Sequence, residues 1–539
     1  MKKFTKLISV FMALIIMSAT IGCSGSKEEE SAALTYWSVL NSRAAQTIKS
    51  YNELLMYQEM EKRTGIDVEF IHPNSGSSGS EAFQILLADG NYPDMMEYNW
   101  ATYPGGPDQA IEDGVIVNLN DYLEEYAPNY YDYLYGEKGK ANGNLYLAQA
   151  ISENGNIYGF HNLNIGTARG FSGIYIRKDK LDEWGMDIPV TIADWDEVFA
   201  KAKSEGFSKP FVCLNDCIAT SQANYNTFNT AFNVGKGFYI DDGKIKFGPF
   251  EPGYKEYVKK LAEWREKGYI DQDYVTTQKT DIEAYMSNDT SIAAYGWVGS
   301  SIGKILPAVK QKNPDSSFDL AACPYPVMNE GDIPMFQELS SEATAPVIAI
   351  SAQCSEEKII DAIKFMDYLY SEEGSVLSSF GVEGDTYTVE NDESGQQHYV
   401  YTDKIYNFEE VGAHSVEAAL YKFFRPGNAG LNQHPDYLEG FYEYEQQKEA
   451  LKVWNKYVDV AKEHMATLTF TAEESAEYAE IYALARPELD AGISNIILGK
   501  QSLDEYDSII EKAKADGYDR LLEINQAAYE RYLERLKAQ

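Results

Sequence analysis

Three tryptophans stand where their ring faces could meet a ligand. Trp37, Trp100 and Trp297 each follow a stretch that the residue pattern predicts to be a buried strand. Open α/β sheets bind ligands beyond the carboxyl ends of their strands. A flat aromatic face suits the C–H face of a sugar ring, and short polar groups suit its hydroxyl edge. We therefore treat the three as candidate ligand contacts, with core packing as the alternative.

Five further residues supply polar groups near predicted strand ends or chain crossings. A carboxylate can accept hydrogen bonds from two hydroxyls at once, and an arginine presents several donors. Asp94 precedes a predicted strand and either caps it or meets ligand hydroxyls. Arg169 lies where the chain is expected to cross between lobes, and it either binds ligand or holds the hinge. Glu383, Asp385 and Tyr387 follow in a glycine-punctuated loop at a later expected crossing.

The chain shows little sign of catalysis or of a cofactor. It has six histidines, none with zinc-helix spacing, and it lacks the Gly-x-x-x-x-Gly-Lys phosphate loop. Carboxylate pairs arise by chance among 84 acidic residues. No stretch fits the twelve-residue calcium loop, although scattered calcium ligands stay open. We predict no enzyme activity and no cofactor. A bridge between Cys213 and Cys217 also stays open.

Composition excludes several classes of protein. The 539 residues carry a formal charge of −38, which repels phosphate backbones and argues against a nucleic-acid partner. With 44% hydrophobic and 13% aromatic residues, 41 of them tyrosine, the chain has ample apolar surface to bury. A single core rarely grows beyond about 300 residues, so two or more lobes are expected.

The amino terminus has the pattern of a secretion signal. A basic start is followed by an apolar run over residues 7–19, which is too short to span a bilayer comfortably. Gly22 then precedes Cys23, which resembles the lipidated cysteine of a bacterial lipoprotein. We predict a signal peptide over 1–22 and a lipid-bearing flexible tether over 23–32. The mature protein would then lie on the extracellular face of the cell membrane.

Two successions of strands and helices follow, which predict an α/β fold, and the first implies a mostly parallel sheet covered by helices. Apolar patterns predict strands over 33–39, 66–71, 94–98, 173–177, 291–295, 318–323 and 345–351. Helical periodicity predicts helices over 46–63, 82–88, 180–184, 191–204, 254–267 and 356–370. An Asp-Gly turn predicts a hairpin over 240–247. From residue 434 onward the chain is predicted to be mostly helical, with capping boxes at Thr471 and Ser502.

Several segments together resemble a known family. They are the Gly-x-x-Pro-Asp stretch within residues 90–96, residues 103–107 with 111–116, residues 176–181, the strand-then-Trp segment 291–297, and residues 380–387. In this order they are similar to extracellular solute-binding proteins of family 1. These are the substrate-binding lipoproteins of carbohydrate ABC importers, and the likeness is strongest to their large Gram-positive branch.

The resemblance implies a two-lobe, periplasmic-binding-protein-like fold with a hinge and a C-terminal helical extension. We expect lobe 1 to comprise 33–160 and 327–380, and lobe 2 to comprise 161–326 and 381–539. The family's activity would be capture of an oligosaccharide or other sugar between the lobes by a monomer, for delivery to permease subunits. An extracellular glycan-acting enzyme is one alternative. A receptor for peptides or other solutes on the same scaffold is another.

Overall fold

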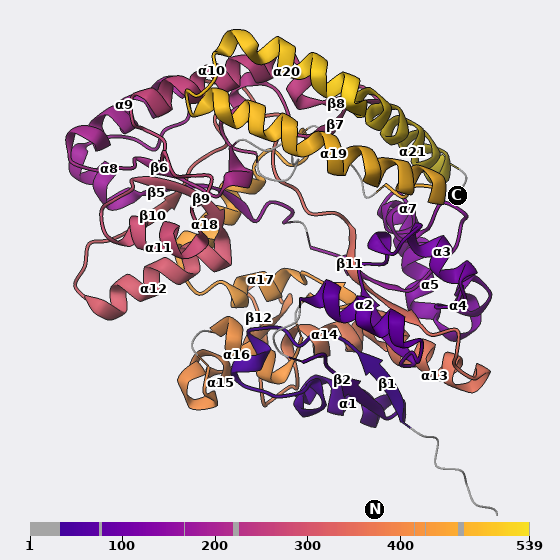
Figure 1. Cartoon of the computed structure of the whole chain (residues 1–539). Coiled ribbons are helices and arrows are strands. Elements are labelled where there is room, and N and C mark those ends of the chain that lie inside the picture. Colours follow the sequence, from indigo (N-terminus) through magenta and orange to yellow (C-terminus); the bar gives the residue numbers. More distant parts are fainter. Residues whose placement is uncertain are drawn as a thin grey trace, which may run out of the picture.

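A computed structural model describes residues 33–74, 78–166, 168–218, 226–413, 416–425, 427–461 and 468–537. The predicted signal peptide 1–22, Cys23 and the tether lie outside these residues. The described chain forms two α/β lobes joined by crossing segments, as predicted, with a layer of long helices over one lobe (Figure 1).

The first lobe is built on a six-stranded mixed sheet with the order β14-β4-β11-β3-β1-β2. Its strands are β1 (Leu34–Trp37), β2 (Val68–Ile71), β3 (Met95–Tyr98), β4 (Phe160–Asn164), β11 (Ala343–Ile350) and β14 (Gly430–Asn432). β1 runs parallel to both of its neighbours, β2 and β3, as the strand–helix succession predicted. The antiparallel β11 returns from the second lobe to pair with β3 and β4, which confirms the expected return near residue 345.

Helices cover both faces of this sheet. They are α1 (Leu55–Thr64), α2 (Gly79–Asp89), α3 (Gly106–Glu112), α4 (Asn120–Tyr126), α5 (Pro128–Leu134), α6 (Glu137–Ala141), α7 (Leu145–Ala150), α13 (Glu356–Asp367) and α14 (Glu372–Phe380). The single helix predicted over 46–63 is broken, because Leu54 adopts an extended conformation with ψ of 122° before α1 begins. The core beneath is rich in buried tyrosine, including Tyr36, Tyr51 and Tyr130.

The second lobe has a smaller sheet with the order β10-β5-β9-β6. Its strands are β5 (Ser172–Arg177), β6 (Phe211–Val212), β9 (Ala293–Trp297) and β10 (Leu320–Ala322), and the predicted hairpin is β7 (Phe238–Asp241) with β8 (Lys244–Phe247). Its helices are α8 (Lys178–Trp184), α9 (Ile192–Ser204), α10 (Pro252–Glu266), α11 (Lys279–Ser287) and α12 (Gly303–Lys312). The helix predicted over 191–204 is α9, and Thr191 and Asp194 form a capping box at its start.

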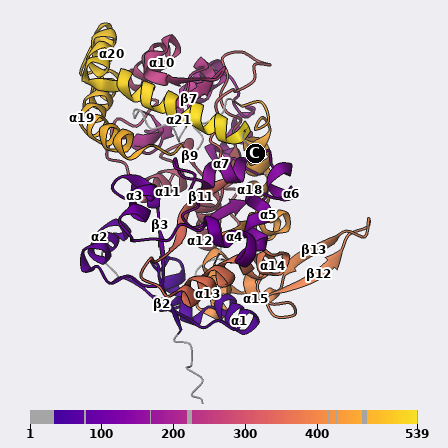
Figure 2. The same ribbon diagram turned by 90° about the vertical axis from the view of Figure 1, so that its right-hand side faces the viewer.

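The segment after residue 381 does not join the lobe that the sequence suggested. Its elements are the hairpin β12 (Tyr387–Asn391) and β13 (Gln397–Tyr401), then α15 (Asp403–Tyr406) and α16 (Val416–Phe423). Apolar residues of this stretch enter the core of the first lobe, and β14 pairs in parallel with β4. The first lobe therefore extends to residue 432, and the β12–β13 hairpin projects from it (Figure 2).

The chain then returns to the second lobe. After α17 (Pro435–Phe441), α18 (Glu445–Asn455) packs on the second sheet, where the Trp454 indole N–H donates to the Cys323 carbonyl at 3.1 Å. The last helices α19 (Ala472–Ile497), α20 (Tyr506–Ala513) and α21 (Asp519–Lys537) cover this lobe (Figure 1). Both predicted capping boxes, at Thr471 and Ser502, are present.

Three segments cross between the lobes, over residues 165–171, 323–342 and 433–444, and they lie close together. A side chain at Gly166 would come within 2.3 Å of the Gln433 carbonyl, and one at Gly170 within 2.9 Å of the Trp454 carbonyl. Glycine is needed at both positions because backbone meets backbone there. The crossings thus form one packed hinge. Within the part of the chain that the structure describes, no helix is both long and apolar enough to cross a membrane.

Candidate ligand-binding cleft

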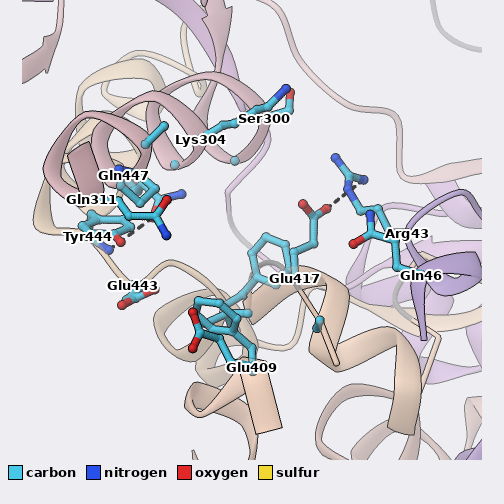
Figure 3. Close-up of a pocket in the computed structure, with 18 of the residues that line it drawn as sticks. Arg43, Gln46, Ser300, Lys304, Gln311, Glu409, Glu417, Glu443, Tyr444 and Gln447 are labelled. Atoms are coloured by element: carbon cyan, nitrogen blue, oxygen red, sulfur yellow. Dashed lines mark hydrogen bonds and ion pairs between the residues drawn. The ribbon is translucent and has the colours of Figure 1, made fainter. Parts of the chain in front are cut away.

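A cavity of about 750 Å³ lies between the two lobes. The first lobe contributes Arg43 and Gln46, which follow β1, and five residues before and within α16, namely Phe408, Glu409, Ala413, Val416 and Glu417. The second lobe contributes Lys279 at the start of α11, Ser300 and α12, and residues of α17 and α18 complete the wall. The lining combines amides, carboxylates, cations and the rings of Phe408, Phe441 and Tyr444 (Figure 3). Such a set suits a ligand with many hydroxyls and some apolar surface.

Two of the three cations that line the cavity form ion pairs, and the third forms none among the described residues. Arg43 pairs with Glu417 at 2.8 Å, and Lys304 pairs with Glu283 at 2.7 Å. Burial raises the pKa of Glu417, although Arg43 and Lys279 oppose that shift, and burial also raises the pKa of Glu443. Lys279 differs from the other two cations, because its ammonium group donates to the Ser300 hydroxyl at 2.7 Å and forms no ion pair among the described residues, although Glu283 and Glu417 are near enough to oppose the lowering of its pKa by burial.

Trp297 lies next to this cavity. It ends β9 and is half-buried, and the Lys279 ammonium lies 5.0 Å from the centre of its ring. Its ring also meets that of Tyr295, with centroids 6.0 Å apart. Gly299 and Ser300, two and three positions after it, line the cavity. Of the predicted ligand contacts, Trp297 is the one that the fold brings nearest to the cleft, and its contact with ligand stays a prediction.

A carboxylate that the sequence did not single out lies beneath Trp297. Glu338, in the second crossing segment, accepts hydrogen bonds from the hydroxyls of Ser172 and Tyr295. Burial raises the pKa of Glu338 to about 7, and the hydroxyl bonds only partly offset the shift. The group therefore changes charge near neutral pH at the hinge. A lone glutamate in a loop has no sequence signature that would have revealed it.

Arg169 connects the crossing segments to one another. Its guanidinium donates to the Ser340 carbonyl at 2.7 and 3.0 Å and pairs with Glu342 at 3.0 Å. Its backbone N–H donates to the Asn455 side chain at 2.7 Å. Of the two roles considered for this residue, these contacts favour holding the hinge.

Trp37 and Trp100 lie inside the first lobe. Trp37 is 4% exposed and packs on Phe83, and Trp100 is completely buried, with its indole N–H donating to the Val347 carbonyl at 3.2 Å. Neither lines the cavity in this conformation. Their contact with a ligand stays a prediction that would need a different arrangement of the lobe.

Asp94 fastens the amino end of β3. Its carboxylate accepts from the Thr35 backbone N–H at 2.8 Å, from the Thr35 hydroxyl at 2.9 Å and from Lys358 at 2.8 Å. Burial acts to raise the carboxyl pKa, but the bonds from Lys358 and Thr35 outweigh it and lower the pKa overall. These contacts favour the strand-capping role over a meeting with ligand hydroxyls.

The loop with Glu383, Asp385 and Tyr387 was expected to cross between the lobes, and it does not. It stays within the first lobe, because Tyr387 begins β12 and its ring packs near Phe380 in that core. Asp385 pairs with Lys404 at 2.6 Å. None of the three lines the cavity, and their part in ligand binding stays a prediction.

The cavity-lining residues of α12, α17 and α18 were not predicted from the sequence. Gln311, Tyr444 and Gln447 lie on or beside amphipathic helices, where a polar residue reaching into a cleft has the same pattern as one reaching into solvent. Arg43 had one signal, since it follows the first strand closely. Only the fold shows that it faces the second lobe.

The thiols and the acidic residues form no metal site in the described chain. Cys213 and Cys217 are buried free thiols, so the bridge left open between them is not formed. Burial, with a contribution from Cys217, raises the pKa of Cys213 and keeps it protonated. The described residues hold no group of three or more histidine, cysteine or acidic side chains placed to bind a metal ion.

Comparison with known proteins agrees with this architecture. Residues 44–376 match the family of bacterial extracellular solute-binding proteins. The chain belongs to this family. That assignment confirms the resemblance drawn from the motifs, and it accounts for two lobes around a central cavity.

Individual relatives of this solute-binding protein are distant. The fructooligosaccharide ABC transporter substrate-binding protein FusA of Streptococcus pneumoniae is 27% identical over 242 residues, or 42% of this chain and 43% of FusA. The polygalacturonan/rhamnogalacturonan-binding protein YtcQ of Bacillus subtilis is 23% identical over 48% of each chain. The chain thus matches less than half the length of these curated relatives.

One solved structure shares the fold of this chain along nearly the whole length of both proteins. A solute-binding protein from Bifidobacterium longum infantis, described as binding human milk oligosaccharides (HMO) and associated with an ABC transporter, superposes with a TM-score of 0.72. The match covers 93% of this chain and 99% of that one, at 18% sequence identity. At this identity the likeness establishes the two-lobe fold.

Proposed function

We propose that this protein captures an oligosaccharide in the cavity between its lobes and delivers it to the permease of an ABC importer. The observation that carries the proposal is the lining of the cavity. Gln46 and Gln311 offer both donors and acceptors, Glu409 and Glu443 offer acceptors, and aromatic rings border them (Figure 3). FusA, YtcQ and the Bifidobacterium protein are all described as carbohydrate-binding, which supports the same substrate class.

The hinge supplies the mechanism of capture. Lobes that meet through a few crossing segments can rotate, and a ligand that contacts both lobes favours the closed arrangement. Arg43 and Gln46 on one side and Lys279 and Ser300 on the other give the ligand contacts from both lobes. The closed form would be the one that the permease recognises.

We further propose that Cys23 carries the lipid that holds the mature protein on the extracellular face of the membrane. The basis is the sequence of the amino terminus, together with membership in an extracellular family. Labelling cells with a palmitate analogue would test it. Cys23→Ser should abolish the label and release the protein into the medium, and a membrane-bound, unlabelled wild-type protein would contradict the lipid assignment.

Thermal-shift and calorimetric screening with neutral and acidic oligosaccharides tests the main proposal. Once a ligand is found, Trp297→Ala should weaken its binding by about 10-fold or more, because a stacked aromatic contributes about 1 kcal/mol or more beyond its buried area. Trp184→Ala is the matched control, since this tryptophan is also half-buried but lies on α8 away from the cavity.

The alternatives make different predictions in the same experiment. Tight binding of peptides with no response to any sugar would replace the sugar proposal with a receptor for another solute. A bound oligosaccharide recovered in shortened form would show a glycan-acting enzyme. We expect the sugar to be recovered unchanged by mass spectrometry.

A further inference from the structure

The cavity contains one positive charge that the protein itself leaves without a neutralising partner. Lys279 is half-buried at the amino end of α11, and it forms no ion pair with any carboxylate in the described ranges. Its ammonium group is held by the Ser300 hydroxyl and by the face of Trp297. Since an ammonium has three N–H donors and one goes to Ser300, donors remain for a ligand.

Burial and the other cations of the cavity lower the pKa of Lys279. Burial is the largest effect that lowers its pKa, and the charges of Arg43 and Lys304 lower it further, while Glu283 and Glu417 oppose the shift. Arg43 belongs to the first lobe and Lys279 to the second, and both act on Glu417, which pairs with Arg43 at 2.8 Å, so the two cations share one carboxylate of the protein. Closing the lobes around a neutral ligand would bring these cations together in surroundings that contain less water, which is unfavourable.

This arrangement stands out against the composition of the chain. The protein has 84 acidic and 46 basic residues, whereas the cavity is lined by three cations and three acids, namely Arg43, Lys279, Lys304, Glu409, Glu417 and Glu443. Arg43 pairs with Glu417 at 2.8 Å and its side chain is 38% exposed, so the guanidinium stays accessible to a ligand. The acids Glu409 and Glu443 lie on the side of the cavity away from Ser300 and Lys304 (Figure 3).

We infer that the ligand is an acidic carbohydrate, with a carboxylate on the sugar that lies between Lys279 and Arg43. This inference rests on the proposed function and specifies the substrate class. The carboxylate bonds one cation from each lobe, so it removes their repulsion and favours closure. Hydroxyls of the same ligand face Glu409 and Glu443, and a sugar ring packs beside Trp297.

A matched pair of probes tests the inference with the whole mature protein. Trigalacturonate carries three carboxylates, and its methyl ester keeps the rings, linkages and length without the charges. Aldotetraouronic acid and neutral xylotetraose form a second pair with a different sugar. In calorimetry we expect at least one acid to bind about 10- to 100-fold more tightly than its neutral counterpart, because hydrogen bonds between charged groups are the strong ones.

Variants at position 279 test whether Lys279 causes the preference for the acidic sugar. Lys279→Gln should remove most of the preference for the acid and leave the neutral sugar within about 3-fold, whereas Lys279→Arg should keep the preference because the charge remains. Lys310→Gln is the matched control, since this lysine lies on α12 outside the cavity and bonds only the Ser316 carbonyl. Raising the salt concentration should weaken binding of the acid more than binding of the neutral sugar.

The outcomes separate this inference from the proposed function. Binding of neutral sugars that equals or exceeds that of their acidic counterparts overturns the acidic class and leaves oligosaccharide capture standing. An acid preference that survives Lys279→Gln overturns the assignment to this residue. Absence of any response to sugars of either kind overturns both proposals.

Discussion

A buried ion pair should hold the segment after residue 381 to the first lobe. Glu97 of β3 and Arg425, just after α16, are joined by two hydrogen bonds of 2.7 and 2.5 Å, and their side chains are 7% and 8% exposed. The Tyr36 hydroxyl also donates to Glu97 at 3.1 Å, and the guanidinium lies 4.3 Å above the Tyr51 ring. Both charges are thus fully engaged away from water.

Replacing one partner leaves the other charge buried without its counter-ion. We expect Glu97→Gln to lower the free energy of unfolding of the first lobe by about 3–5 kcal/mol, which is typical of a broken buried pair. The double variant Glu97→Gln with Arg425→Met should lose about 1–3 kcal/mol less than the sum of the single losses, because the uncompensated charge has gone. Urea unfolding followed by circular dichroism gives these values.

Hydrogen exchange shows where the loss acts. In Glu97→Gln the amides of α16 and β14 should exchange faster, while those of β5 and β9 should not change. Asp179→Asn is the matched control in the second lobe, because Asp179 holds the buried Arg177 through bonds of 2.8 and 2.7 Å. A loss below about 1 kcal/mol, or faster exchange in the second lobe for Glu97→Gln, would refute the reasoning about this pair.

Three further predictions follow from buried groups. The pKa of Glu338 is raised to about 7, so the folded state holds this proton over a range in which the unfolded chain has lost it, and stability falls as pH rises from about 4.5 to 7. In urea unfolding, Glu338→Gln should therefore be as stable as the wild type near pH 4.5 and more stable by about 2–3 kcal/mol at pH 8. Equal stabilities at pH 8 would contradict the raised pKa of Glu338. Glu153→Gln removes the 3%-exposed carboxylate that pairs with Arg531 of α21. The free energy of unfolding should fall by about 2–4 kcal/mol, and amides near the end of α21 should exchange faster. Unchanged exchange there would show that the contact is not formed. Trp100→Phe leaves the Val347 carbonyl without its donor and should cost about 1–3 kcal/mol, whereas weaker sugar binding at unchanged stability would show instead that Trp100 meets the ligand.

The sequence foretold most elements of both sheets and many of the helices. Strands such as β1, β5 and β9 are short buried runs, and their apolar residues have few ways to escape water. Thr191, Thr471 and Ser502 begin helices as predicted, because a hydroxyl that accepts from a nearby backbone N–H acts within one turn. The motifs in their order also indicated the family.

The three tryptophans predicted as ligand contacts lie in different surroundings. Trp297 lies beside the cavity, while Trp37 and Trp100 fill the core of the first lobe. All three follow strands and look alike in the sequence. Their difference comes from which neighbours cover them, since α2 and α3 supply the side chains that pack over Trp37 and Trp100.

By itself the sequence determined most of the elements, since these depend on short-range patterns of polarity and capping, and its length and motifs indicated the two-lobe class; the secretion signal stays a prediction. Only the tertiary structure decided which lobe takes residues 381–432, because β14 is three residues long and is fixed by pairing with β4, more than 250 positions earlier. It also decided the cavity, where Arg43, Lys279, Glu417 and Gln447 meet from four distant parts of the chain. Such contacts depend on how sheets and helices pack, and local sequence carries no record of that packing.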